Sequence, residues 1–230
     1  MSPAGHATIS VTGHDELRHP AERGSLQLEV SVQSPDRERA VAQATRLHHE
    51  VVQEAEGFVG SGAATRWSSD QIAVWSAERW TSDDASRQEK KKHVRYHVAA
   101  VSVTVRFQDF SALGEWAVQR GSVDGCSIVG VDWALTEETR STALRTTRTG
   151  AVRDARSRAE AYAAAAGFSG VELVALYEDG LRPQAAPGAG VMMAASRGFA
   201  GGGGGPSVEL RPADITVSAT VTADYRTAEV

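Results

Sequence analysis

Histidines are the residues of this sequence that come nearest to a recognisable catalytic motif. The stretch HEVVQ at residues 49–53 is the nearest match to the zinc motif HExxH, in which two histidines one helical turn apart share one metal ion. Here the second histidine position is occupied by Gln53, so the motif is incomplete. His93 and His97 are also four residues apart, but in a strand this spacing separates them by about 13 Å. We therefore expect neither pair to bind a metal ion.

The other candidate residues are isolated in the sequence. His6, His14 and His19 lie in or beside the first strands, and we expect them to be polar surface residues. Cys126 is the single cysteine, so it forms no internal disulfide, and no candidate base lies near it in the sequence. The glycines at 201–205 lack the Lys-Ser/Thr pair that completes a phosphate-binding loop. We therefore predict no catalytic, cofactor-binding or metal-binding residues, no cofactor and no enzymatic activity.

Composition and charge exclude several classes of partner. The chain has 230 residues, of which 41% are hydrophobic and 23% are charged, which is typical of a globular protein. Its net charge is -5, so no overall positive field draws it to nucleic acid. The basic cluster EKKKHVR at 89–95 contains no interleaved aromatic residues, and we expect it to be a solvated hairpin tip. We therefore predict no nucleic-acid partner.

The sequence predicts no membrane span, because it contains no run of about 20 apolar residues. The N-terminal residues MSPAGHATISVTG include neither the basic nor the apolar region of a signal peptide. We expect a cytoplasmic protein for the chain as written, and a periplasmic or envelope protein if an export signal is missing from it.

The first half of the chain alternates between predicted strands and helices. Apolar residues at every second position predict strands around 9–11 and 26–32, which we expect to form a hairpin through the polar segment 19–24. Ser34, Pro35 and Asp36 predict the start of a helix, and Gly57 its end.

The middle of the chain predicts a second hairpin and a short helix. Extended segments at 65–80 and 94–107 form a long hairpin, in which a change of apolar parity predicts a β-bulge near Ala99 and Ala100. Asp109 caps a short helix that ends at Gly121. A further strand has four apolar residues on one face, namely Val129, Val131, Trp133 and Leu135.

A long helix is predicted from the cap Thr136 to Gly167. We expect its inner face to be a stripe of small residues that lets the helix pack closely on a sheet, consisting of Ala151, Ala155, Ala159, Tyr162 and Ala166. Its arginines are expected to form a solvated face, so the helix has a structural role.

The last third of the chain contains two strands and a long connection. Residues 171–177 and 215–225 predict strands, and the second closes the fold. Between them, residues 181–206 are rich in glycine, alanine and proline, and we expect a flexible loop inside the domain. Loops of this length in compact domains are often functional.

Seven stretches in this order resemble the SIMPL family over about residues 8–226. They are ISVTGHDEL, GSLQLEVSV, a capped helix, VSVTVRFQDFSALGEW, VDGCSIVGVDWAL, AVRDARSRAEAYAAAAG and the late strand ITVSATVTADY. The resemblance implies an α+β fold, in which two long helices and one short helix pack on a largely antiparallel sheet, as one domain over residues 1–230. It also implies a bacterial envelope or periplasmic protein or a kinase-associated adaptor, no established enzymatic activity and a tendency to self-associate.

Three hypotheses for function follow. The first is a non-enzymatic binding or scaffold protein that forms homo-oligomers and binds a protein partner. Its contact surfaces would be exposed strand edges and the 181–206 loop. The second is a small-molecule binding protein whose pocket lies between the sheet and the long helix and is gated by that loop. The third is an enzyme, which would require histidine, cysteine and carboxylate groups to cluster in the folded chain.

Overall fold

The computed structural model describes residues 6–82, 91–183 and 212–228, which form eight strands and three helices. The chain divides into two compact units. Unit 1 consists of Met1–Pro20, Leu135–Gly202 and Asp214–Val230, and unit 2 consists of Ala21–Ala134 and Gly203–Ala213. The α+β prediction is confirmed, and the strands form two antiparallel sheets, one in each unit. A single domain over residues 1–230 stays a prediction.

The sheet of unit 1 has three strands in the order β1-β8-β7, with the last strand of the chain in the centre. Their bounds are β1 Thr8–His19, β7 Gly170–Glu178 and β8 Ile215–Ala228. The predicted hairpin of the first two strands is wrong, because β1 pairs along its whole length with β8, from Thr8 opposite Arg226 to His19 opposite Ile215. The late strand therefore closes the sheet, as the sequence predicts.

Helix α3, Glu137–Ala165, begins and ends where its sequence signals predict. The hydroxyl of Thr136 accepts a hydrogen bond from the Thr139 backbone N–H at 3.3 Å. At the other end, Gly167 adopts a left-handed φ of 85°, and the N–H of Phe168 donates to the carbonyl of Ala163 at 3.0 Å. This is the hydrogen-bond pattern of a Schellman cap, which favours glycine because its φ is positive.

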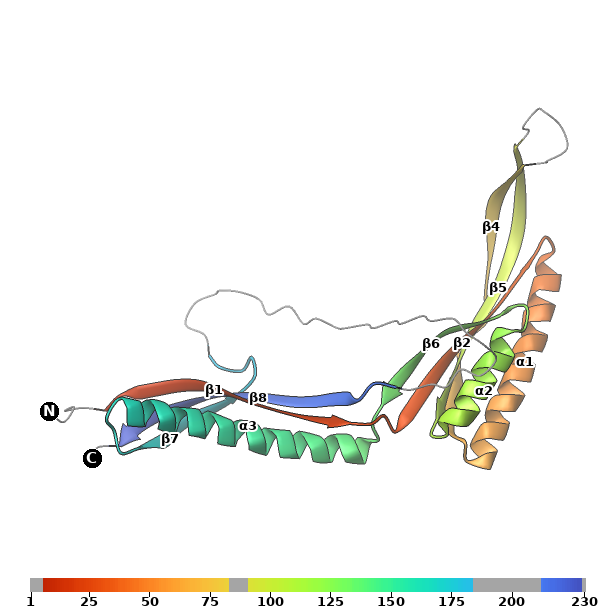
Figure 1. Ribbon diagram of the computed structural model, residues 1–230. Helices are drawn as coiled ribbons and strands as arrows, with labels where there is room; N and C mark the ends of the chain where they lie inside the picture. Colours follow the sequence, from red (N-terminus) through yellow and green to blue (C-terminus); the bar gives the residue numbers. More distant parts are fainter. Residues whose placement is uncertain (1–5, 83–90, 184–211, 229–230) are drawn as a thin grey trace. The chain divides into compact units, whose positions relative to one another are not determined.

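Helix α3 lies along β1 and β8 on one face of this sheet (Figure 1). Every fourth residue of its inner face is buried, namely Ala143, Thr147, Ala151, Ala155, Ala159 and Ala163. Three of the five predicted stripe residues are confirmed, but Tyr162 is 63% exposed and Ala166 is exposed too. The buried residues follow the row of positions four apart, which is inclined to the helix axis, and this row continues from Ala159 to Ala163. Tyr162 lies beside that row and therefore remains exposed.

Strand β1 and helix α3 approach each other so closely that a Cβ atom would clash at two glycine positions, with backbone atoms at Gly13 and with a side chain at Gly150. A Cβ atom on Gly13 would overlap the Ala151 carbonyl oxygen and lie 2.5 Å from the Ala155 nitrogen. Conversely, a Cβ on Gly150 would overlap the Asp15 carboxylate and lie 2.9 Å from the Asp15 Cβ. Each element therefore presents a glycine to the other at the point of closest contact.

We expect Gly13→Ala to destabilise the protein by about 2–3 kcal/mol or more, because the atoms that the new methyl group meets are backbone atoms. Gly57→Ala is the matched control, since Gly57 lies in a helix with no atom near its added Cβ, and it should stabilise by about 0.5–1 kcal/mol. Urea denaturation measures both. Equal midpoints for Gly13→Ala and the wild type would contradict the close approach.

The sheet of unit 2 has the order β3-β5-β2-β6, and β4 also pairs with β5. The strands are β2 Arg23–Ser34, β3 Ala64–Ser69, β4 Ala73–Ser82, β5 Lys91–Phe107 and β6 Cys126–Ala134. Helices α1, Arg37–Ser61, and α2, Phe110–Gly121, lie on the same face of this sheet (Figure 1). Their inner residues and the sheet form one apolar core, in which the rings of Phe58, Phe107 and Trp116 lie 5.2 to 5.8 Å apart.

Helix α2 begins as predicted, whereas both ends of α1 differ from the prediction. Asp109 caps α2 by accepting from the N–H groups of the second and third residues after it. In α1 the capping residue is Asp36 rather than Ser34, and the helix continues through Gly57 to a left-handed Gly62 with φ 80°. A Cβ atom added at Gly57 would face open space, and the helix tolerates this glycine. The helix ends instead at Gly62, whose positive φ suits a C-terminal cap.

The β-bulges lie elsewhere than predicted. Strand β5 pairs with β2 without a register shift at Ala99 or Ala100, and its outer half pairs with β4. Strand β6 instead has an extra residue at Val129, because Gln27 pairs with Gly130 and Leu28 with Ile128. Val129 is consequently 48% exposed, and the core-facing residues of β6 are Cys126, Ile128, Val131 and Trp133.

Candidate functional site

The structure does not bring the predicted histidines together. The Nε2 atom of His49 lies 3.0 Å from Gln53 Nε2 on the exposed side of α1. His97 hydrogen-bonds Ser76 through Nδ1 at 3.0 Å, and the side chain of His93 lies outside the described residues. Among the described residues, no group of three or more histidine, cysteine, aspartate or glutamate side chains could hold a metal ion.

The N-terminal histidines only partly match the expected polar surface. His14 is half exposed and lies 3.1 Å from the Thr220 hydroxyl, and His6 lies 3.4 Å from the Thr227 carbonyl. His19 departs from the expectation, because its Nε2 atom is buried without a hydrogen-bond partner. The glycines at 201–205 lie outside the described residues.

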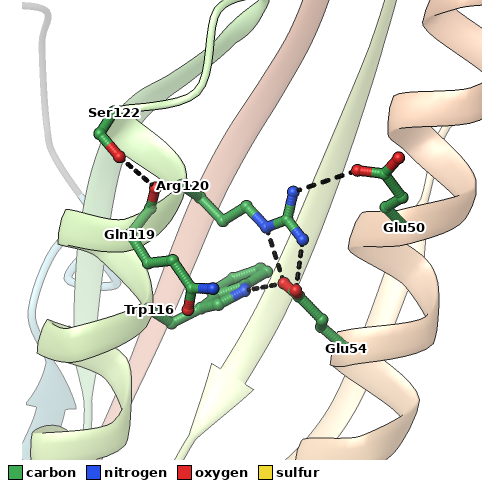
Figure 2. A network of polar contacts seen from close by, with 6 residues as sticks. All are labelled: Glu50, Glu54, Trp116, Gln119, Arg120 and Ser122. Atoms are coloured by element: carbon green, nitrogen blue, oxygen red, sulfur yellow. Dashed lines mark hydrogen bonds and ion pairs between the residues drawn. The ribbon is translucent and has the colours of Figure 1, made fainter.

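The most concentrated polar site joins α1 to α2 in unit 2 (Figure 2). Glu50 and Glu54 lie one turn apart on α1, and Trp116 and Arg120 lie one turn apart on α2. Arg120 donates to both carboxylate oxygens of Glu54, and its Nε lies 2.7 Å from Oε2. The Trp116 indole N–H donates to the same Oε2 at 2.7 Å, and Glu50 lies 3.7 Å from Arg120.

The charges of this Glu54–Arg120 network stabilise each other. Burial alone raises the pKa of Glu54, but hydrogen bonds from Arg120 and Trp116 and the charge of Arg120 outweigh it and hold the pKa below its ordinary value. The hydrogen bond to Glu54 raises the pKa of Arg120, against the opposing effect of burial. Both groups are therefore ionised at neutral pH, and their hydrogen-bonding atoms point at each other.

Cys126 lies near this network, but its environment does not favour a reactive thiolate. The side chain is buried at the start of β6. Burial raises the pKa of the Cys126 thiol, and the lowering effect of the Arg120 charge is smaller. Nucleophilic chemistry requires the thiolate. The geometry therefore favours a structural role for Cys126 and for the Glu54–Arg120 network.

The sequence alone does not predict this network, although it contains a signal for a buried arginine. Arg120 falls on the same helical face as Leu113 and Trp116, which are buried, so a charged residue interrupts an apolar stripe. A buried arginine requires a carboxylate partner, but the helix that supplies it lies 66 residues earlier in the chain.

An apolar groove lies on the other side of α2. It has a volume of about 460 Å³, and α2 contributes Gly114, Ala117, Val118 and Gly121 to its lining. The sheet contributes Leu26, Ile128 and Val131, and Ser122, which follows α2, completes the lining. We refer to this feature as the α2 groove.

The hollows beside α3 are more polar than the α2 groove. One of about 220 Å³ includes Arg148 and Glu178, whose side chains form an ion pair at 2.8 Å. Another includes Asp15, Arg145 and Arg153. The predicted loop at 181–206 lies outside the described residues from 184 onward, so gating of a pocket by this loop stays a hypothesis.

Comparison with known proteins identifies the family. A model described as SIMPL, a protein of unknown function (DUF541), matches residues 9–225, which is nearly the whole chain. This chain belongs to the SIMPL family. The resemblance noted in the sequence is thereby confirmed, with close agreement in the residues covered. No curated protein matches this chain at a significant level.

In the part of the chain that the structure describes, no helix is both long and apolar enough to cross a membrane.

We expect Glu54→Gln to destabilise the protein by about 2–3 kcal/mol at pH 7, because Arg120 is buried and would keep only the more distant carboxylate of Glu50 as a counter-charge. The lowered pKa of Glu54 means that its ionised form stabilises the folded state above pH 4.5, the ordinary value. This contribution is lost as the pH falls through the lowered pKa. The difference in unfolding free energy between wild type and variant should therefore shrink on acidification.

Glu56→Gln is the matched control for this experiment, because Glu56 is an exposed residue of the same helix. It should change stability by less than about 0.5 kcal/mol at either pH. Equal effects of the two substitutions at pH 7 would show that the ion pair does not hold α1 to α2.

We expect iodoacetamide to alkylate Cys126 at least about 100-fold more slowly in the folded protein than in urea at pH 8, because the thiol is buried and mainly protonated. Mass spectrometry of timed samples measures both rates. Comparable rates in the two conditions would mean that the thiol is accessible and ionised.

Proposed function

We propose that this SIMPL-family protein is a non-enzymatic binding or scaffold protein that assembles with copies of itself through strand β7. The observation that carries the proposal is an exposed apolar surface on β7, formed by Leu173, Val174 and Leu176. Their side chains are 53%, 60% and 45% exposed, respectively. We refer to these three residues as the β7 apolar strip.

The geometry of β7 explains why the strip is uncovered. Leu173 pairs with Tyr225 and Leu176 with Ala223, and these two partners are buried under α3. The register shift at Val174 thus places both leucines on the face of the sheet that carries α3. Because α3 lies over β1 and β8, the leucines remain open beside it.

The two edges of the unit 1 sheet differ in a way that favours association at β7. At the β1 edge, the backbone N–H of His14 donates to the Asp154 carboxylate of α3 at 3.0 Å. The outward side chains of β1 are polar, which discourages pairing with another chain. Within the described residues β7 pairs with β8 alone, and three of its five exposed residues are apolar, the other two being Glu172 and Glu178. An apolar edge strand of this kind is a template for contact with another chain.

A second copy of the chain is the partner that the strip fits most simply. In a two-fold arrangement the same leucines from both copies would bury each other, without needing any complementary charge. The non-enzymatic part of the proposal draws support from the Glu54–Arg120 network, whose ionised groups satisfy each other. A further protein partner, no nucleic-acid partner, and a cytoplasmic or envelope location stay predictions from the sequence.

Light scattering after size-exclusion chromatography tests the assembly. We expect the wild type to have a mass that is a multiple of 24.4 kDa, and the double variant Leu173→Lys/Leu176→Lys to approach 24.4 kDa, because two buried lysines would repel across the contact. Both leucines are about half exposed, so the folded chain should accommodate the lysines.

Val59→Lys is the control, because it places a lysine at an exposed apolar position of α1, away from β7. It should keep the wild-type mass. A wild-type protein that stays monomeric at high concentration would rule out the proposal, and an unchanged mass for the double variant would rule out the β7 strip as its surface.

A further inference from the structure

We propose that unit 1 binds the free N-terminal segment of another polypeptide as an added strand beside β8. Strand β8 is central in its sheet and pairs with β1 from Ile215 to Arg226. Strand β7 covers the other edge of β8 only from Val221 onward, because β7 ends at Glu178, opposite Val221 (Figure 1). In the part of the chain that the structure describes, residues 215–220 therefore have a strand on one side only. We refer to the space along this free edge as the β8 slot.

The chain turns away from the β8 slot at the end of β7. The N–H of Leu181 donates to the Glu178 carbonyl at 3.0 Å, and Gly180 adopts a left-handed φ of 74°. Arg182 then donates to the Asp224 carboxylate at 2.8 and 3.1 Å. The neighbours of Asp224 in β8 are buried against α3, so Asp224 lies on the opposite face of the sheet. The turn and the ion pair thus lead the chain onto that face, and the line of β7 is left open.

A hollow of about 220 Å³ lies at the β7 end of the slot. Strand β8, helix α3 and the end of β7 all contribute to its lining, which consists of Ser218, Ala219, Thr220, Val221, Leu144, Arg148, Glu178 and Asp179. A strand that continued the line of β7 would enter this hollow and contact both the edge of β8 and the side of α3.

The backbone chemistry of the slot identifies its occupant as an extended polypeptide. Alternate residues of a strand edge direct their N–H and C=O groups outward, and another extended chain presents the complementary groups at the same spacing. The pairing of β8 with β1 has no register shift over residues 215–220, so the free edge is regular. All strand pairs of this sheet are antiparallel, and we expect the added strand to be antiparallel to β8 as well.

The direction of the added strand places its N-terminal end against β7. An antiparallel strand in the slot runs in the same direction as β7, so its first residue lies beside Thr220 and its sixth beside Ile215. The end of β7 closes the slot at Thr220. An internal strand of a folded partner, including a second copy of this chain, would bring its preceding residues against β7. A free N-terminus has no preceding residues and avoids this overlap.

The charges at the closed end of the slot complement an amino terminus. Asp179 lines the hollow and forms no hydrogen bond or ion pair within the described part of the chain. The neighbouring Glu178 is already paired with Arg148 at 2.8 Å. An N-terminal amine has a pKa of about 7.7–8.0, so it is mainly protonated at pH 7. Asp179 therefore offers the opposite charge at the position where the amine of the added strand would lie.

The side chains of β8 predict the sequence pattern of the bound segment. Val217 and Ala219 point to the face that carries α3, where Leu144 also contributes apolar surface. The alternate residues point to the polar, opposite face, namely Thr216, Ser218 and Thr220. Because side chains of neighbouring strands lie beside each other on each face, a segment that alternates polar and apolar residues fits the slot.

Fluorescence anisotropy tests the proposal with the peptide TVTVTVGK, which has a free N-terminus and carries fluorescein on its lysine. We expect saturable binding to the full wild-type chain. The same peptide with an acetylated N-terminus should bind about three- to fivefold more weakly, because it lacks the charge that faces Asp179. A peptide extended by GSGS at its N-terminus should bind at least about tenfold more weakly, because the added residues meet the end of β7.

Ala219→Leu should weaken peptide binding by at least about tenfold, since its side chain would grow into the hollow. Circular dichroism checks that this variant folds. Ala161→Leu is the matched control, because Ala161 is an exposed residue of α3 that does not line the hollow, and it should bind within about twofold of the wild type.

Asp179→Asn should weaken binding of the free peptide to the level of the acetylated one, so that this variant no longer distinguishes the two peptides. A purely structural role of Asp179 would weaken both peptides alike. Asp70→Asn, at an exposed aspartate of unit 2, is the control and should keep the wild-type difference.

An absence of saturable binding by the wild type would overturn the proposal, and this includes the case in which another segment of the chain already fills the slot. Equal binding of the free and the extended peptides, or unchanged binding by folded Ala219→Leu, would also overturn it. The slot lies on β8 and not on the β7 apolar strip, so the Leu173→Lys/Leu176→Lys variant should still bind the peptide. The outcome is therefore separable from that of the assembly experiment.

Discussion

The close approach of β1 and α3 at Gly13 and Gly150 sets the arrangement of the rest of unit 1. A row of alanines on its inner face lets α3 pack close to the sheet. A helix is about 10 Å wide and neighbouring strands are about 4.8 Å apart, so α3 covers roughly two strands. Those strands are β1 and β8. The third strand, β7, therefore keeps exposed apolar side chains on the same face, so the close packing of one helix and the open surface beside it have a common origin.

Unit 2 uses larger side chains and a polar contact for the same purpose of holding helices on a sheet. Its core contains leucine, valine and aromatic residues, and α1 and α2 cover one face together. The ion pair between Glu54 and Arg120 joins the two helices along one side of α2. Because that side of α2 is directed at α1, the opposite side faces β6 with glycine and alanine, and space remains there.

The features that the sequence predicts correctly are those determined within a few residues. Thr136 and Asp109 cap helices by binding amides two or three residues away, so the signal and its partner lie in the same stretch. The features it does not predict depend on distant partners. The pairing of β1 with β8, the bulge at Val129 and the partner of Arg120 are each set by a segment tens to hundreds of residues away. At Gly57, the local stop signal was overridden because the helix continues to pack on the sheet, with Phe58 in contact with the core.

The pairing of β1 with β8 also has a consequence for biosynthesis. A ribosome makes β1 before the other strands and helices of the two units, and its partner emerges about 200 residues later, which corresponds to roughly 10–40 s of translation. Unit 2 is nearly contiguous from Ala21 to Ala134. Its strands and helices are therefore all synthesised before β8, the pairing partner of β1, is made. Polar residues alternate along β1, namely serine, threonine, histidine and charged residues. They keep the unpaired strand hydrated until β8 is synthesised and completes the sheet.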